Sequence, residues 1–373
     1  MELSILSLDG GGIRGIITAS ILAHIEARVQ ELSRNNQLKI ADCFDLLSGT
    51  STGGIIVALA LTPSDKNEMT ANGITSKEEI SAISRPKYSA ADILELYLEM
   101  GPLLFQRSLW YRLGSGFGLF KSRYNKEAVE EHCKKCFGDR WISEVVKDCL
   151  ITSYEMNTRK ALFFSKYNVL KYGDSANYKL SDIARATSAA PTYFSPALIN
   201  AKDKTFRHLV DGGVYANNPA MCALVETVKL WPGNGVKDYF MLSVGTGKVI
   251  KSYDWEKTHK YGFIKWLEPI IDILTSSVSE TVDFQMQQLF SCNGVPDSYI
   301  RLEPPLLSSD SRMDNASKRN VKALSEAAKS FIDKNSEVLE KISQRIILPS
   351  RPLRDLQRLN IPAGTPSPLR LRE

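Results

Sequence analysis

The sequence lacks three features, each of which would indicate a particular class of protein. No stretch approaches the ~18 consecutive apolar residues of a membrane-spanning helix. The six cysteines are scattered along the chain and form no disulfide framework. Cys133 and Cys136 are close in sequence, but no second cysteine pair or histidine cluster completes a zinc site, and one helix face explains their spacing. We therefore expect no transmembrane segment, no bound metal, no cofactor and no disulfide scaffold.

A strong excess of one charge is also missing. The net charge is +5, and the Pro- and Arg-rich segment after Pro349 supplies +3 of it, from five arginines against Asp355 and Glu373. The rest of the chain is near neutral, so we expect no nucleic-acid partner. Neither a basic region nor a cleavage site accompanies the strand-like run from Leu3 to Leu8, so this is not a Sec signal peptide. We expect a cytoplasmic protein that can contact membranes peripherally, while export by a signal-independent route stays open.

Short apolar runs alternate with segments of helical periodicity along most of the chain. The expected strands are 3–8, 43–47, 149–154, 161–167, 206–210, 239–244 and 299–302. The expected helices are 16–32, 90–100, 125–137, 180–190, 219–230, 263–290 and 317–346, with a further one that begins near residue 55. This alternation predicts an α/β fold with a largely parallel sheet and helices on both faces. We expect one domain over residues 1–348 and a flexible tail over residues 349–373.

One stretch combines a strand, a sharp turn and a helix around a serine. Gly49, Ser51 and Gly53 form G-x-S-x-G between the apolar run 43–47 and the helix that begins near residue 55. In this context the motif predicts a nucleophile elbow, in which a strained turn exposes the serine hydroxyl at the top of a sheet. The glycines are needed because side chains there would collide with the neighbouring strand and helix. The other interpretation is a glycine-rich turn that only starts a helix.

A second glycine-rich turn follows the first strand. Gly10, Gly12 and Gly15 satisfy G-x-G-x-x-G, the dinucleotide-binding fingerprint, between a strand and a helix. That fingerprint also requires an acidic residue about 20 positions further on, at the end of the second strand. Glu31 lies in the predicted helix and Asp42 precedes the next strand, so this requirement is not met. Consecutive glycine N–H groups suit an oxyanion as well as a phosphate, so both interpretations stay open.

A nucleophilic serine needs a base, and the best candidate is an aspartate at the end of another predicted strand. Asp211 follows the strand 206–210, and Gly212 and Gly213 let the chain turn away at once. The carboxyl ends of strands are where parallel α/β sheets build their sites. The alternative role for this aspartate is a helix cap or a turn. His208 is the histidine nearest to a motif, and it is the candidate for a third catalytic member.

Four sequence blocks occur together in one order and carry a resemblance to a known family. They are Asp9–Gly15 (DGGGIRG), Gly49–Gly54 (GTSTGG), Ser188–Phe194 (SAAPTYF) and Asp211–Gly213 (DGG), and Leu242–Gly247 (LSVGTG) adds a fifth. The set resembles the patatin family, the lipid acyl hydrolases related to plant storage patatins. The resemblance extends from about residue 3 to residue 250 and fades towards the C-terminus.

The resemblance implies a three-layer α/β/α fold and a catalytic Ser–Asp dyad without a histidine. By motif match, Ser51 is the nucleophile and Asp211 is its general base. Gly10, Gly11 and Gly12 then supply the oxyanion hole, with Arg14 beside them, although a plain surface charge is another interpretation for that arginine. Gly15, Gly49, Gly53, Gly212 and Gly213 are the remaining glycines of the matched motifs.

The expected function is that of a phospholipase A-type serine hydrolase, which cleaves fatty acyl esters of glycerolipids through an acyl-enzyme. Phospholipid in a membrane or micelle is the favoured substrate, by resemblance. A catalytically silent storage or scaffold protein with the same fold is one alternative, and a dinucleotide-binding oxidoreductase is another. The head group, the preferred ester position, an activating partner and the oligomeric state stay undetermined.

A lipid hydrolase needs an apolar rim near its nucleophile, and two segments could provide one. Residues 101–121 mix aromatic side chains, arginines and glycines without periodicity, which is typical of a mobile lid or docking loop. An apolar stripe on the expected helix 263–290 includes Trp266, Ile270 and Leu274, and such stripes are usually core. We therefore expect the loop to contact lipid and the stripe to be buried.

Overall fold

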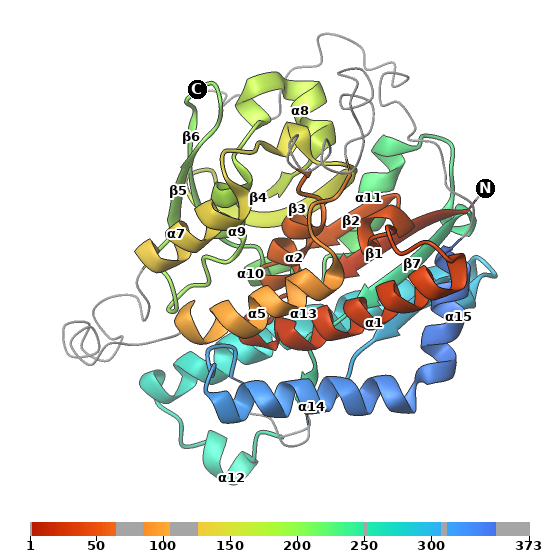
Figure 1. Ribbon diagram of the computed structural model, residues 1–373. Coiled ribbons are helices and arrows are strands. Elements are labelled where there is room, and N and C mark those ends of the chain that lie inside the picture. Colours follow the sequence, from red (N-terminus) through yellow and green to blue (C-terminus); the bar gives the residue numbers. More distant parts are fainter. Residues whose placement is uncertain (1, 65–84, 105–125, 250–251, 307–311, 348–373) are drawn as a thin grey trace.

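The structure is a computed structural model that describes residues 2–64, 85–104, 126–249, 252–306 and 312–347. A twisted sheet lies at its centre with helices on both sides (Figure 1). The strands are β1 (Leu3–Leu8), β2 (Leu46–Gly49), β3 (Asp148–Glu155), β4 (Lys160–Phe164), β5 (Ala197–Asn200), β6 (Phe206–Asp211), β7 (Tyr239–Val244) and β9 (Tyr299–Leu302). Their order is β5-β6-β3-β2-β1-β7-β9, with β4 paired to β3. β8 (Lys248–Val249) and β10 (Pro305–Leu306) form a separate parallel pair.

The helices divide between the two faces of the sheet. The first face is covered by α1 (Gly15–Ser33), α2 (Thr52–Ala60), α5 (Ala90–Leu104), α7 (Lys126–Phe137), α9 (Leu180–Thr187), α14 (Lys318–Lys334) and α15 (Ser336–Ile346). The second face is covered by α11 (Ala220–Leu230) and α13 (Phe263–Cys292). The short helices α8 (Lys166–Tyr172), α10 (Gly213–Ala216) and α12 (Trp255–Thr258) lie in the connections.

Strand alternation explains why each face has its own core. In β1, Leu6 and Leu8 belong to the cluster beneath α1, whereas Leu3 and Ile5 belong to the cluster beneath α11 and α13. Successive side chains of a strand point to opposite faces, so a strand buried on both sides is apolar throughout. The predicted three-layer α/β/α architecture is therefore confirmed.

The sheet is mostly parallel, as predicted, but one end of it is not. β1 pairs in parallel with β2 and β7, β2 with β3, and β7 with β9. β3 pairs antiparallel with β4 and β6, and β5 pairs antiparallel with β6. β5 was not predicted from the sequence. This antiparallel end carries Asp211, and its geometry decides how that residue approaches Ser51.

Several predicted elements have other bounds in the structure, and for two of them a side chain at the end shows the cause. The strand expected over 161–167 stops at Phe164, because Ser165 caps α8 by accepting a hydrogen bond from the N–H of Asn168 at 3.1 Å. The helix expected over 317–346 is two helices, α14 and α15, which meet at Asn335. There the Asn335 side chain donates a hydrogen bond to the carbonyl of Phe331. This side-chain donor competes with the backbone N–H groups that would otherwise continue the helix.

Two further predictions concern regions that the structure does not describe in full. Residues 348–373 lie outside the described part, so the division into a domain and a tail stays a prediction. None of the described helices combines the length and the apolar character that crossing a bilayer requires.

Candidate active site

Ser51 lies in the turn between β2 and α2, with a backbone φ of 54° that non-glycine residues rarely adopt. A Cβ on Gly49 would lie 2.3 Å from the carbonyl oxygen of Gly53, and one on Gly53 would lie 2.2 Å from the carbonyl oxygen of Leu8. Both distances are too short for a side chain, so only glycine permits this turn. The elbow predicted from the sequence is confirmed in its geometry.

Asp211 reaches Ser51 from the opposite direction along the sheet. Gly49, at the end of β2, pairs with Ile151 of β3, and Asp211, at the end of β6, pairs with Ser153 two residues further on. β4 occupies the other edge of β3 over the same residues, so β2 and β6 share one edge and meet end to end. The expectation that Asp211 ends a parallel strand is therefore wrong, because β6 is antiparallel to β3 and brings the carboxylate to the elbow head-on.

The two side chains are in hydrogen-bond contact. Ser51 Oγ donates to Asp211 Oδ2 at 2.6 Å, and the N–H of Gly213 donates to Asp211 Oδ1 at 2.7 Å. A Cβ on Gly212 would lie 2.0 Å from Thr152 Oγ1, so the turn after Asp211 has no room for a side chain. Asp211 is buried, and burial raises its pKa from 3.8 to about 7, while the bonds from Ser51 and Gly213 oppose this rise. The carboxylate is therefore a base that changes its charge near neutral pH.

His208 does not join this pair. It lies three residues before Asp211 in β6, so the two side chains leave opposite faces of the strand. The side chains that line the cavity at Ser51 include Asp211 and His132 but not His208. His132 belongs to α7, where the sequence had suggested no functional role for it.

Three threonines hold the elbow, and the sequence did not indicate them. The N–H of Ser51 donates to Thr187 Oγ1 at 2.9 Å, and this hydroxyl donates to the carbonyl of Thr152 at 2.7 Å. Thr50 Oγ1 and Thr152 Oγ1 lie 2.7 Å apart, which ties the turn before the serine to β3. Thr50 lies inside one matched sequence block and Thr187 directly precedes another, which is the signal that could have revealed them.

The first glycine-rich turn lies against the elbow, but its three glycines are not equivalent. The N–H of Gly10 donates to the backbone carbonyl of Asn217 at 3.0 Å, so this donor is already used. A Cβ on Gly10 would lie 3.2 Å from Ser51 Cβ, which shows how closely the turn approaches the serine. Gly11 and Gly12 line the cavity with Ser51, and their N–H groups have no recorded partner among the described residues.

Arg14 is buried, so the interpretation of it as a plain surface charge is wrong. Its Nε donates to the carbonyl of Gly11 at 3.4 Å, a long and weak bond. Burial lowers the pKa of the guanidinium. Arg14 is therefore placed behind the glycine-rich turn, in contact with its backbone, and it is not among the residues that line the cavity.

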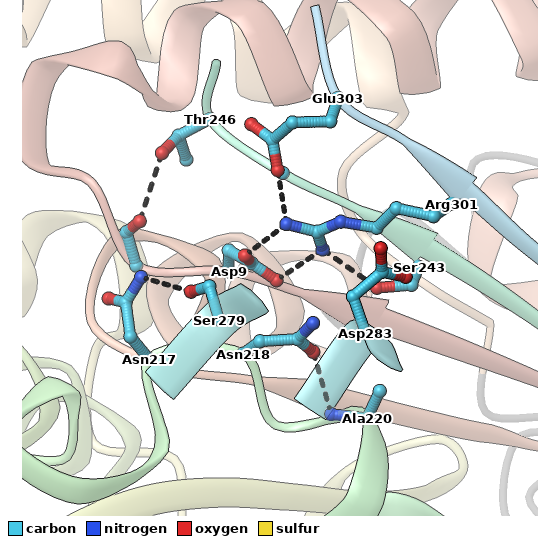
Figure 2. Close-up of polar contacts among 12 residues, drawn as sticks. Asp9, Asn217, Asn218, Ala220, Ser243, Thr246, Ser279, Asp283, Arg301 and Glu303 are labelled. Atoms are coloured by element: carbon cyan, nitrogen blue, oxygen red, sulfur yellow. Dashed lines mark hydrogen bonds and ion pairs between the residues drawn. The ribbon is translucent and has the colours of Figure 1, made fainter. Parts of the chain in front are cut away.

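A buried ion pair beneath the turn was also missed by the sequence analysis (Figure 2). Arg301, in β9, donates to both carboxylate oxygens of Asp9, at 2.8 and 2.6 Å, and also contacts Ser243 and Glu303. Burial raises the pKa of Asp9 to about 6, and the guanidinium opposes that rise. The pair fixes the residue that immediately precedes Gly10, so it supports the turn from below.

Asn217 connects the glycine-rich turn to α13. Its backbone carbonyl accepts from Gly10, and its side chain donates to Ser279 Oγ at 3.0 Å (Figure 2). The next residue, Asn218, lies just before the N-cap Pro219 of α11, and its Oδ1 accepts from the N–H of Ala220 at 3.0 Å.

Ser51 and Asp211 open into a cavity of about 300 Å³. Its walls are mainly apolar and come from α2, α5, α7 and α13, for example Ile55, Leu96 and Phe137. A cavity of this size and lining can hold a hydrocarbon chain with its polar end at the serine. Among the described residues, no group of three or more His, Cys, Asp or Glu side chains is arranged to bind a metal.

The sequence analysis considered two segments for a lipid-facing rim, and it expected only the loop 101–121 to contact lipid. Of residues 101–121, only 101–104 are described, and they continue α5; the docking-loop prediction otherwise lies outside the described residues. The stripe on α13 was expected to be core, and this is wrong for Trp266, Ile270 and Leu274, which are exposed.

The sequence comparisons with known proteins agree on one family. The sequence profile of the family described as Patatin-like phospholipase matches residues 6–224. Patatin-like protein 4 of Arabidopsis thaliana is 32% identical over 354 residues, which cover 89% of this chain and 84% of the relative. Probable inactive patatin-3-Kuras 1 of Solanum tuberosum is 28% identical and covers 89% of this chain and 87% of the relative. The crystal structure of VipD from Legionella pneumophila aligns at 12% identity with a TM-score of 0.34, over 89% of this chain and 67% of VipD.

Proposed function

We propose that this chain, which belongs to the patatin-like phospholipase family, is an active phospholipase A-type hydrolase that cleaves fatty acyl esters of glycerolipids with Ser51 and Asp211. The family supports a lipid acyl hydrolase in general terms. The observation that supports the specific proposal is the 2.6 Å contact between Ser51 Oγ and the buried carboxylate of Asp211, both of which line an apolar cavity.

The first half of the reaction would use this contact directly. Asp211 Oδ2 accepts the proton of Ser51 Oγ as that oxygen attacks the acyl carbonyl carbon. The carbonyl oxygen becomes an oxyanion, and its donors in this proposal are the N–H groups of Gly11 and Gly12, which line the cavity with Ser51. Asp211 then returns its proton to the leaving alcohol, and the fatty acyl group stays on Ser51 as an ester.

The second half would repeat the same proton transfers with water. Asp211 accepts a proton from a water molecule, which attacks the acyl carbonyl. The second tetrahedral species collapses when the proton is given back to Ser51 Oγ, and the fatty acid leaves. In this scheme Gly10 and Arg14 position the turn and do not contact the oxyanion, because the Gly10 N–H already donates to Asn217 and Arg14 does not line the cavity.

A silent member of the family is the second candidate. One relative carries the words "probable inactive" in its name, so membership alone does not establish activity. A fluorophosphonate reacts only with an activated serine, so it separates the two candidates. We expect the wild type to be labelled and to hydrolyse a short-chain ester, and Ser51→Ala to lose both while staying folded. Residual hydrolysis by Ser51→Ala within tenfold of the wild type would refute the assignment of the nucleophile.

A further inference from the structure

Five large apolar side chains are exposed on α12 and the N-terminal half of α13. We call them the α12–α13 surface, and they are Trp255, Trp266, Ile270, Ile273 and Leu274. Their exposed fractions reach 76% for Trp255 and 53% for Leu274. Single exposed apolar residues are ordinary, but a group on adjoining elements indicates an interaction site.

The group is continuous along one helix. Trp266, Ile273 and Leu274 each lie three or four residues from Ile270, so the four side chains share a face of α13. α12 precedes this helix in sequence, and Figure 1 shows it at the lower edge of the molecule. The hydroxyl of Tyr253, directly before the N-cap of α12, donates to Asp272 of α13 at 2.8 Å, so the exposed Trp255 lies on a segment that is tied to this helix.

This surface runs into the cavity that contains the serine. Leu274 is half-exposed on the surface and also lines the cavity, together with its helix neighbours Ile271 and Thr275. Ser51 and Asp211 line the same cavity. A molecule that enters the cavity on the α13 side therefore passes over the α12–α13 surface.

The side-chain types are those of a lipid interface. The rings of Tyr261 and Trp266 pack edge to face at 5.8 Å, and Lys265 Nζ lies 6.0 Å from the Tyr261 ring. Trp, Tyr and Lys are amphipathic, with an apolar body and a polar tip that reaches the head-group level. Asp254, the N-cap of α12, and Lys257 in that helix lie 3.7 Å apart, and such neighbouring charges of both signs suit a zwitterionic head group more than an anionic one.

We propose that the α12–α13 surface docks on a zwitterionic glycerophospholipid bilayer and holds the cavity mouth against it. The inference rests on the proposed function for its choice of partner. An acyl chain would then leave the bilayer along α13 and reach Ser51 without crossing water. Docking of a second copy of this chain, or of another segment of the same chain, would bury the same residues and is distinguished below.

The test measures binding separately from hydrolysis. Phosphatidylcholine vesicles are floated with the protein in a Ser51→Ala background, so that the lipid is not consumed. Replacement of Trp255, Trp266 and Ile270 by serine should weaken vesicle binding at least tenfold, because each removes apolar area that would insert. The matched control replaces Val225 and Val228 on α11 by serine; they are exposed by 56% and 63% and line no part of the cavity. The control should bind like the parent.

Each outcome decides the proposal. Equal binding by the triple variant and the control refutes it, and so does a parent protein that does not bind vesicles. A concentration-dependent dimer that the triple variant loses, seen by light scattering, would assign the surface to a second copy. A lower melting temperature with unchanged vesicle binding would assign it to another segment of the chain. Failure of the wild type to hydrolyse a soluble short-chain ester would refute the proposed function but not the docking surface.

Discussion

Asp211→Asn should abolish activity and stabilise the protein at the same time. Asparagine keeps the shape of the side chain, and its Oδ1 can still accept the bond from the N–H of Gly213. Its amide would then face Ser51 Oγ and cannot take the serine proton. We expect turnover of a soluble ester to fall by about 10³- to 10⁴-fold, as when a base is disabled in related serine hydrolases.

The gain in stability follows from the burial of Asp211. The rise of its pKa from 3.8 to about 7 means that ionisation in the folded protein costs about 4 kcal/mol. Between these two pH values the folded state binds more protons than the unfolded state, so stability falls as the pH rises. The variant has no such charge, and at pH 8 it should be more stable than the wild type by up to about 4 kcal/mol. At pH 5 the difference should narrow to below about 2 kcal/mol.

Denaturant unfolding at pH 8 and pH 5, with ester hydrolysis on the same samples, tests both halves of this prediction. Asp148→Asn is the matched control, because Asp148 is also largely buried, with a pKa raised to about 6, at the opposite end of β3. It should keep its activity. Hydrolysis by Asp211→Asn within tenfold of the wild type would refute the assignment of the base. A stability gain of the variant over the wild type that is smaller at pH 8 than at pH 5 would refute the argument from burial.

Further predictions follow from the same geometry. The wild-type rate at pH 6 should be about one-tenth of its value at high pH, because Asp211 must be ionised to act as base. A rate that stays constant down to pH 5 would contradict this. His208→Ala should keep hydrolysis within about twofold, since its side chain leaves the other face of β6; loss of activity in the folded variant would restore a triad. Arg301→Met should destabilise the fold by about 3–5 kcal/mol in denaturant titration, because it leaves the buried Asp9 unpaired. Gly53→Ala should prevent stable folding, measured by circular dichroism, since its Cβ would meet a backbone carbonyl at 2.2 Å.

The pH profile alone does not distinguish an aspartate base from a histidine base. An aspartate with its ordinary pKa would stay ionised, and so keep the serine activated, well below pH 6. Burial does raise the pKa of Asp211, to about 7, near the ~6.5 of an ordinary histidine. The comparison of Asp211→Asn with His208→Ala is therefore the decisive experiment.

The sequence predicted those features that contiguous residues encode. β1, β7 and β9 have the predicted bounds, because their apolar runs are short and end in turn residues. The elbow at Ser51 was predictable, since the need for glycine on both sides is a local steric requirement. The ordered motif blocks predicted the family, which the comparisons confirm. The break at Asn335 was missed because a single polar residue in a periodic stretch does not by itself end a helix.

Only the tertiary structure decided how these parts act on one another. β6 meets β2 end to end because β3 pairs with both on one edge, and no local pattern encodes a pairing between such distant segments. The raised pKa of Asp211 and the loss of the Gly10 N–H to Asn217 likewise arise from segments far apart in the sequence. The periodicity of α13 specified an apolar face but not whether that face is buried. Periodicity is a property of one helix, whereas burial depends on the elements that pack against it.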